Sequence, residues 1–546
     1  MFWLFSYAAV ADNSTGRQAI ASAHPLATEA GMAIFAEGGN AFDAAVAVSS
    51  VLAVVEPYSS GFGGGGFWLL HQAKNSQDVM IDGREIAPQA MNADSFLDKN
   101  GNVMDHLSVD GALAAAIPGE AAALAHIATK YGRLPLSTSL APAIAIARTG
   151  FLVDSIYRRL AKFRLKELQA SENATKIFLR AGDVPLEGAL LPQPELAQTL
   201  ERLALEGAKG FYQGETAKRL VQAVRAAGGR WTLADLQNYQ VKERKPVRGS
   251  FQGYEVVSAP PPSSGGIALI SMLNMLEEKN WRAYKGAEQK HLVVEVMRRA
   301  YRDRAEYLGD PDFVDVPQER LLQQRYAAQL ADSISMQQAT PSTALVNVLP
   351  LSESDHTSHF SLLDENGNYV AATMSINYPF GSGFVATGTG ILLNDEMDDF
   401  SAKPGVGNVF GLVGAQANAI APGKRPLSSM SPTFVRSEDQ LLVLGTPGGS
   451  RIISMVLLGI LGFTQHGDVQ SLVSAPRFHH QYLPDEIRFE PETFSRIEQA
   501  RLLDLGHSLR PLEDSYGNMQ AVYWDKKKNK VTAASDPRGL GRAVVR

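Results

Sequence analysis

The sequence of 546 residues contains no cysteine. Disulfide bonds, thiolate metal sites and cysteine nucleophiles are therefore excluded within this chain. Excess charge is also small, since the formal net charge is −6. The one basic cluster, at 526–528, lies in a predicted hairpin turn. A nucleic-acid-binding surface is therefore not expected.

Long apolar runs are missing as well. No segment approaches the roughly 18–20 apolar residues that span a bilayer, and the run at 455–463 is much shorter. Residues 2–11 are apolar and end in Ala9-Val10-Ala11, which resembles a cleavage site, but no basic residues precede them. Residues 1–20 therefore fit either a shortened signal peptide or a disordered start.

The sequence contains no convincing metal-binding or nucleotide-binding motif. The closely spaced histidines, at 356/359 and 479/480, form isolated pairs without the spacing of a metal site. Gly61, Gly63 and Gly66 match the spacing of a dinucleotide fingerprint, but they follow a predicted helix and open a strand, which reverses the required order. No metal and no cofactor is expected. We expect these glycines to let backbone approach backbone or ligand closely.

A hairpin is the most informative feature. Two runs of strand-forming residues, 358–364 and 369–375, flank the Asn366-Gly367 turn. A two-residue turn would pair Thr357 with position 376, and a three-residue turn with a bulge would pair it with Ser375. In both cases Ser375 and Asn377 return beside Thr357. A cut before Thr357 would add an α-amine with an unperturbed pKa of about 7.7–8.0, which suits a general base.

Other elements follow from local signals. A strand and a helix precede Gly38-Gly39, and Asn40 is the predicted N-cap of a buried helix at 41–55. The chain between about 110 and 350 reads as mainly helical, with amphipathic runs at 155–170, 195–207, 215–227 and 287–308. The proline-containing stretch 309–356 is predicted to be an exposed connector that could admit a cut.

Several polar residues stand at strand ends. Arg84 follows a predicted strand and could form a surface ion pair or clamp a carboxylate. The acids at 395–399 follow another strand and are either solvated or functional. Hydroxyls at 428 and 429 precede a strand, and the glycines at 448 and 449 form a strand-to-helix turn whose N–H groups could bind an oxyanion.

These motifs, taken in order, resemble the γ-glutamyltranspeptidase family over residues 21–538. The matching segments are Gly-Gly-Asn-Ala-x-Asp-Ala-Ala-Val at 38–46, Arg-Glu-x-Ala-Pro at 84–88, Pro-Pro-Pro-Ser-Ser-Gly-Gly at 260–266, the Thr357 hairpin, Asn-x-x-Met-Asp-Asp-Phe at 394–400, Pro-Leu-Ser-Ser-Met-Ser-Pro-Thr at 426–433 and Pro-Gly-Gly-Ser-Arg at 447–451. The resemblance implies an α+β fold, the αββα sandwich of N-terminal-nucleophile hydrolases. It also implies a precursor that cuts itself between His356 and Thr357 into a large subunit, 21–356, and a small subunit, 357–546, which stay together as a heterodimer.

The resemblance also assigns roles. Thr357 would be the nucleophile, with the Ser375 hydroxyl bonded to it and Gly448 and Gly449 as oxyanion donors. The α-carboxylate of a γ-glutamyl substrate would be held by Arg84, Ser428 and Ser429, and its α-ammonium by Asn377, Glu396 and Asp399. Glutathione and related γ-glutamyl compounds would be donors, and water, amino acids or peptides acceptors. Because members of the family usually work in the periplasm or outside the cell, the resemblance also implies a periplasmic or secreted protein.

Two departures and three alternatives accompany this assignment. Many relatives carry threonine at the position of Ser375, and many bacterial relatives carry tyrosine at the position of Phe410, in the loop that covers the site. The alternatives are a cephalosporin or glutaryl acylase, a poly-γ-glutamate depolymerase, and a γ-glutamyl-binding protein that never matures. Asp399 argues against the acylases, because a glutaryl group has no ammonium to pair with a buried carboxylate.

Overall fold

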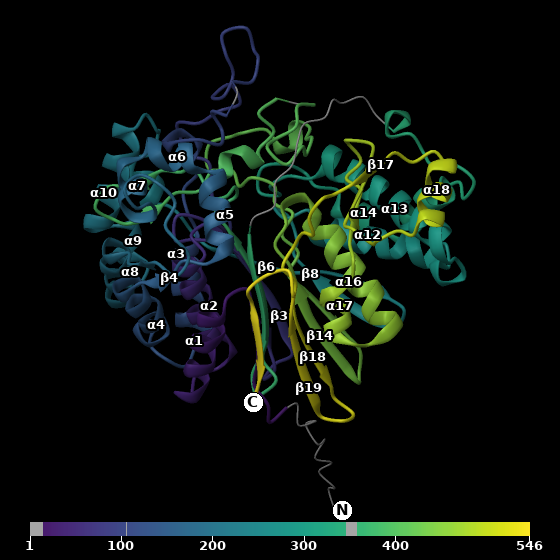
Figure 1. The fold of residues 1–546 in the computed structure, drawn as a ribbon, viewed down its shortest axis with the longest axis horizontal. Helices are drawn as coiled ribbons and strands as arrows, with labels where there is room; N and C mark the ends of the chain where they lie inside the picture. Colours follow the sequence, from purple (N-terminus) through teal and green to yellow (C-terminus); the bar gives the residue numbers. More distant parts are fainter. Residues whose placement is uncertain (1–14, 105, 346–356, 404) are drawn as a thin grey trace, which may run out of the picture.

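The computed structural model describes residues 15–104, 106–345, 357–403 and 405–546. The apolar start at 2–11 and the expected cut at His356 lie outside these residues. Two antiparallel sheets are stacked in the centre of the molecule, and helices cover the outer face of each (Figure 1). The predicted αββα sandwich is confirmed.

The first sheet combines strands from both ends of the chain. Its seven antiparallel strands follow the order β20-β1-β9-β10-β2-β3-β6. Strands β9, β10 and β20 come after position 357, and they pair directly with β1 and β2 from the start of the chain. The bounds are β1 Ala19–Ser22, β2 Gly65–Gln72, β3 Gln77–Gly83, β6 Lys242–Arg244, β9 Ser358–Leu363, β10 Tyr369–Ser375 and β20 Arg542–Val545.

The second sheet has six antiparallel strands in the order β19-β18-β14-β13-β8-β7. Their bounds are β7 Val247–Phe251, β8 Tyr254–Ser258, β13 Thr433–Arg436, β14 Gln440–Gly445, β18 Gln520–Asp525 and β19 Lys530–Ser535. In the described part of the chain, three small sheets lie outside the sandwich. They are built from β4 Phe151–Leu152 with β5 Leu190–Leu191, β11 Val385–Ala386 with β12 Ile391–Leu392, and β15 Phe478–His479, β16 Ile487–Phe489 and β17 Leu509–Pro511.

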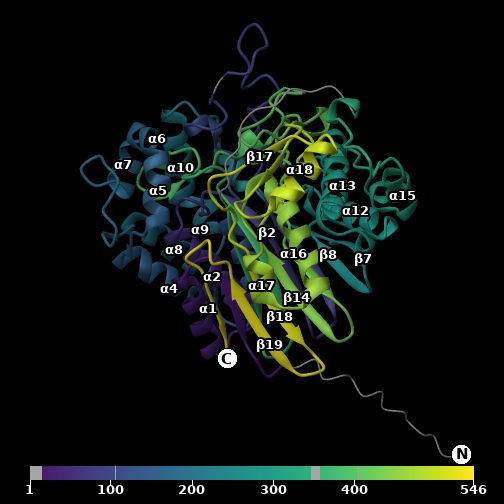
Figure 2. The ribbon, with the colours of Figure 1, turned by 45° about the vertical axis from the view of Figure 1, so that its right-hand side comes forward.

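Two hydrophobic cores hold these layers together. One lies between the first sheet and the helices α1 to α5 and α8 to α10. The other fills the space between the sheets and under α12, α13 and α16 on the far side. Helices α16 and α17 lie over β14 and β18 (Figure 2). Among the described residues, no helix combines the length and apolar character needed to cross a bilayer.

The helix bounds match most of the sequence predictions. The predicted runs at 155–170, 195–207, 215–227 and 287–308 correspond to α5 with α6, α8, α10 and α13. The bounds are α1 Pro25–Ala36, α2 Ala41–Val55, α3 Glu120–Tyr131, α4 Leu136–Thr149, α5 Ser155–Phe163, α6 Leu165–Ala170, α7 Glu172–Phe178, α8 Pro194–Glu206, α9 Lys209–Tyr212, α10 Gly214–Ala226, α11 Leu233–Gln237, α12 Gly265–Glu278, α13 Gly286–Tyr307, α14 Gln318–Leu322, α15 Gln324–Asp332, α16 Ile452–His466, α17 Val469–Ser474 and α18 Arg496–Asp504.

Helix α2 shows how local sequence sets a boundary. Asn40 accepts hydrogen bonds from the backbone N–H groups of Phe42 and Asp43, and Asp43 accepts one from the Asn40 N–H. This reciprocal capping box satisfies donors that the first helical turn leaves unpaired. All residues of the helix are buried, as its apolar composition predicted. The helix leads directly to the turn that precedes β2.

The hairpin β9–β10 settles the register that the sequence left open. Ser358 pairs with Met374 and Leu363 with Tyr369, so the same register places Thr357 opposite Ser375. Gly367 in the turn has φ +83°, a left-handed conformation that glycine adopts without steric cost. Of the two alternatives, the three-residue turn with a bulge is therefore correct.

For the middle of the chain, one expectation was wrong and another was incomplete. The stretch 309–356 was expected to be an exposed connector, but its described part contains α14 and α15, and Leu321, Ala327 and Ala331 are buried. Short amphipathic helices there were masked by the prolines around them. The described part of 110–350 is mainly helical, as expected, but that prediction did not include β6, β7 and β8. Strand β6 pairs with β3 and β8 with β13, which are distant in sequence, whereas β7 forms a hairpin with β8.

Candidate active site

Thr357 stands at the open end of the central hairpin, and its side chain is buried. Its Oγ1 lies 3.4 Å from the Oγ of Ser375, the last residue of β10. Ser375 Oγ in turn accepts a hydrogen bond of 2.8 Å from the Asn377 backbone N–H. The three polar residues that the hairpin was expected to gather are therefore together.

The glycine run before β2 passes closely behind this strand end. A Cβ on Gly64 would lie 2.1 Å from the carbonyl oxygen of Ser375, and one on Gly63 would lie 1.9 Å from the carbonyl oxygen of Leu392. Any side chain would force these segments apart. The close backbone approach expected from the glycines is confirmed.

Arg84 follows β3 and is fully buried. Its Nη1 lies 2.6 Å from Glu396 Oε2, its Nη2 contacts Asp399 Oδ2, and its Nε donates to the Pro426 carbonyl at 3.2 Å. Although burial opposes the charge, Glu396, Asp399 and Glu85 raise the pKa of Arg84 further above its ordinary value. The arginine is an interior cation with acidic partners, and the surface ion pair is excluded.

The acids after β12 are not solvated. Glu396 and Asp399 lie on the 3₁₀-helix Glu396–Asp399, and Glu396 is 1% exposed. Burial raises the pKa of Glu396 well above its usual range, against the effect of Arg84. Within the described structure, neither carboxylate oxygen of Glu396 receives a hydrogen bond of good geometry, despite the short approach to Arg84. A cationic donor entering the pocket would supply one.

The side-chain amide of Asn377 is fixed by Asp395. It adopts φ +74°, and its Nδ2 donates to the carbonyl oxygen of Asp395 at 3.1 Å and to Asp395 Oδ2 at 3.2 Å. Because the amide nitrogen is engaged there, the side-chain carbonyl oxygen is the atom that Asn377 can offer to a ligand. An acceptor oxygen suits an ammonium group.

Ser428 and Ser429 lie in the loop before β13, and a residue that the sequence analysis missed supports them. Arg304 of α13 donates to Ser429 Oγ at 3.4 Å and to Ser264 Oγ at 3.0 Å. Ser264 Oγ donates onward to the Ser428 carbonyl at 2.7 Å. Burial lowers the pKa of Arg304 to about 10. Nothing local distinguishes Arg304 from the other arginines of α13, so the sequence gave no signal for it.

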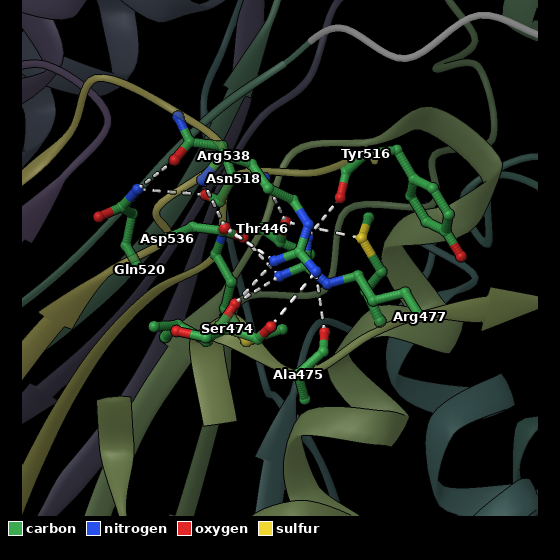
Figure 3. A network of polar contacts seen from close by, with 12 residues as sticks. Thr446, Ser474, Ala475, Arg477, Tyr516, Asn518, Gln520, Asp536 and Arg538 are labelled. Atoms are coloured by element: carbon green, nitrogen blue, oxygen red, sulfur yellow. Dashed lines mark hydrogen bonds and ion pairs between the residues drawn. The ribbon is translucent and has the colours of Figure 1, made fainter. Parts of the chain in front are cut away.

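Gly448 and Gly449 form the turn between β14 and α16. Their φ values of +142° and +53° lie in the region that favours glycine. Upstream, the Thr446 hydroxyl accepts a hydrogen bond from the Asn518 N–H at 3.3 Å. Figure 3 shows the surrounding network, in which Arg538 donates to Asp536 at 3.0 Å. Asp536 also accepts a hydrogen bond from the Met519 N–H at 2.9 Å. The turn is therefore anchored by the C-terminal segment.

Two cavities meet at Thr357. The first is a narrow pocket of about 20 Å³, lined by Arg84, Thr357, Ser375, Asn377, Glu396, Asp399, Phe410, Leu412, Ser428, Ser429, Met430, Gly449 and Ile452. The second is a wider cleft of about 730 Å³, whose lining includes Glu56, Gly448, Arg451 and Asn518 as well as Thr357. Nine of the ten predicted site residues line the narrow pocket. Gly448 lines the cleft, so the two glycines lie where the cavities join.

Residues 27–545 of this chain match the family model described as Gamma-glutamyltranspeptidase. This chain belongs to the γ-glutamyltranspeptidase family. It is 43% identical over 531 residues to the glutathione hydrolase proenzyme of Escherichia coli (strain K12), covering 95% of this chain and 90% of that protein. The family members matched at this level are enzymes, and so is this chain.

Solved structures of this family and of acylases are also similar. The Helicobacter pylori γ-glutamyltranspeptidase matches with a TM-score of 0.58 and 42% identity over 59% of this chain and 93% of that chain. A cephalosporin acylase from Bacillus halodurans matches with a TM-score of 0.85 and 26% identity over 100% and 99%. The sandwich is thus shared with acylases, while sequence similarity favours glutathione hydrolases.

Phe410 lines the narrow pocket of this γ-glutamyltranspeptidase. Its ring is 4% exposed and packs edge-on against Tyr378, with ring centroids 6.4 Å apart. Gln481 Nε2 donates to the Phe410 carbonyl at 3.2 Å. Packing and a backbone contact thus hold Phe410 in the pocket wall, without a hydroxyl at this position.

One group of side chains in the described structure has the composition of a metal site, namely His291, Glu295 and His507. His291 Nδ1 and His507 Nε2 are hydrogen-bonded to each other at 2.7 Å, and Glu295 is ion-paired with Arg298 and Arg299. None of the three lines the narrow pocket. These contacts explain the cluster without an ion.

Proposed function

We propose that this γ-glutamyltranspeptidase is a glutathione hydrolase and γ-glutamyltransferase that matures by cutting itself between His356 and Thr357. The observation that carries the proposal is the placement of the Thr357 hydroxyl at the mouth of a narrow pocket with both cationic and anionic side chains. Such a pocket suits a zwitterionic α-amino-acid head. It does not suit a plain carboxylate.

Maturation and turnover would use the same hydroxyl. In the precursor, Thr357 Oγ1 attacks the His356 carbonyl and the peptide bond is exchanged for an ester, which frees the α-amine of Thr357. Water then hydrolyses the ester, which gives the His356 carboxylate and returns the Thr357 hydroxyl. In the mature enzyme the α-amine takes the hydroxyl proton as Oγ1 attacks the γ-glutamyl carbonyl. The departing amine then takes that proton, which leaves a γ-glutamyl ester on Thr357.

The narrow pocket would hold the acyl half of the substrate. Arg84, Ser428 and Ser429 would bind the α-carboxylate, and Asn377, Glu396 and Asp399 the α-ammonium. The ammonium also provides the donors that the Glu396 oxygens need. The substrate carboxylate would pair with the cation Arg84, and the substrate ammonium with the carboxylates Glu396 and Asp399. Arg84 could therefore keep its ion pairs to these two acids while the substrate is bound.

The reacting carbonyl would lie between the two cavities. The N–H groups of Gly448 and Gly449 would bind the oxyanion, each contributing about 2.7–4 kcal/mol to transition-state stabilisation. Because the narrow pocket is filled by the glutamyl head, the amine half of the substrate would extend into the wider cleft. Acceptor amino acids, peptides or water would enter by the same side.

The strand order supports a lasting heterodimer after the cut. Strands β9, β10 and β20 of the segment 357–546 pair with β1 and β2 of the preceding segment, and β13 pairs with β8. Separating the chains would break both sheets. Following the family location, we also propose that the enzyme works in the periplasm or outside the cell, which cell fractionation would test.

Intact mass measurement of the denatured protein tests the proposal. The wild type should give chains 1–356 and 357–546, apart from any N-terminal processing. Thr357→Ala should remain one chain, whereas Thr357→Ser, which keeps the hydroxyl, should still be cut. An uncut wild type, or a cut at another position, would refute the N-terminal nucleophile and favour the binding-protein alternative.

A further inference from the structure

A glutamate outside the narrow pocket lies close to the nucleophile strand. Glu56 directly follows α2, is 5% exposed, and lines the wider cleft together with Thr357 and Gly448. Its Oε2 accepts a hydrogen bond of 2.7 Å from the Ser358 hydroxyl. Ser358 is the residue after the nucleophile, so the carboxyl is joined to the end of the strand that carries Thr357.

Glu56 has no ion-pair partner among the described residues, although Arg159 and Arg451 also line the wider cleft. The other oxygen of Glu56 accepts from the Tyr58 hydroxyl at 3.4 Å. Burial, with a smaller contribution from Asp154 at the N-terminus of α5, raises the pKa of Glu56 to about 7, against the effect of the Ser358 hydrogen bond. A buried acid without a counter-charge is costly for folding and is enriched at functional sites.

Ser358, the first residue of β9, is also close to a second side chain of the loop after α2. Ser358 Oγ lies 3.1 Å from Ser60 Oγ, on the loop that also carries Glu56. The Ser358 side chain is therefore fixed by two groups from one loop. Because consecutive Cα atoms are about 3.8 Å apart, fixing Ser358 restricts where the neighbouring Thr357 and its backbone nitrogen can lie.

We propose that Glu56 is a positioning residue for the nucleophile: it holds Thr357 through the Ser358 hydroxyl, and it is the counter-charge of the α-amino group that the cut creates. This inference rests on the proposed self-cleavage. Before the cut the Thr357 nitrogen is a neutral amide, so Glu56 has no charged partner there. After the cut an ammonium and a carboxylate would face the same cleft.

A charge on Glu56 would shift the pH dependence of activity in one direction. A carboxylate near an ammonium raises the pKa of the amine, by about 1–3 units at close range. Since the neutral amine is the base, the acid limb of the pH–rate profile marks this pKa. The other titratable groups acting here are Tyr58 on the same loop and Asp154, while Arg159 of α5 acts on Tyr58.

The test compares pH profiles of kcat/KM with a γ-glutamyl anilide. Glu56→Gln keeps the side-chain shape but removes the charge, so the acid limb should move about one pH unit lower. Ser358→Ala keeps the charge but removes the link, so the limb should stay while the plateau rate falls about 3- to 10-fold. Asp154→Asn retains an N-cap for α5 and removes a charge that is only a lesser cause of the raised Glu56 pKa, so it should move the limb much less than Glu56→Gln and leave the plateau rate unchanged.

Each outcome decides a separate claim. An acid limb unmoved in Glu56→Gln, with the chain correctly cut, overturns the counter-charge. A plateau rate unchanged in Ser358→Ala overturns the positioning role. If Glu56→Gln is folded but uncut while Asp154→Asn is cut, positioning is supported in the precursor; if Glu56→Gln does not fold, Ser358→Ala decides through its rate. An uncut wild type would instead refute the proposed function itself.

Discussion

Replacing Asp399 by asparagine should distinguish a γ-glutamyl enzyme from an acylase. The Asp399 side chain is 13% exposed, lines the narrow pocket, and also accepts a hydrogen bond from Asn408 at 3.2 Å. Asparagine keeps one acceptor oxygen for Arg84 but loses the negative charge. The variant should therefore fold and mature, and it should lose the attraction for a substrate ammonium.

The magnitude follows from the bond that is lost. A hydrogen bond to a charged group contributes about 1.5–3 kcal/mol, which corresponds to a loss of roughly 10- to 150-fold in kcat/KM. A glutaryl anilide has the same chain length but no ammonium. With this substrate the loss in kcat/KM should stay below about threefold.

The assay measures kcat/KM for both anilides in wild type and variant. Asp398→Asn is the matched control, because Asp398 binds Ser108 and the Val409 N–H and does not line the narrow pocket. It should affect the two substrates equally. An equal loss with both anilides in Asp399→Asn, or no loss with either, would refute the assignment of Asp399 to the ammonium.

Two further predictions concern buried cations and histidines. Arg304→Met should raise KM for γ-glutamyl donors about tenfold, because Ser429 loses a charged donor worth about 1.5 kcal/mol, with kcat changed less; an unchanged KM would contradict its supporting role. Burial lowers the pKa of His359 to about 3. As the pH falls, the unfolded state therefore binds a proton at this histidine before the folded state does. The free energy of unfolding should fall as the pH drops from about 6.5 towards 3, by about 3 kcal/mol at pH 4. Urea unfolding of the uncut Thr357→Ala chain, with and without His359→Gln, measures this; equal pH slopes would contradict it.

Local signals in the sequence determined much of the fold. The Asn40 cap, the buried helix α2, the Asn366-Gly367 turn and the glycine turn before α16 were all predicted and are confirmed. Each depends on residues within a few positions of one another, since caps and turns satisfy their own backbone groups. The family motifs then identified the candidate site residues.

Tertiary structure decided how these residues meet. Three contacts join distant segments: Arg84 with Asp399, 315 residues apart, Ser358 with Glu56, 302 residues apart, and Arg304 with Ser429, 125 residues apart. Charge and burial at such positions depend on how two sheets and their helices pack. The sequence therefore named the nucleophile and its pocket, whereas only the fold revealed the second arginine, the buried glutamate and the two cavities that meet at Thr357.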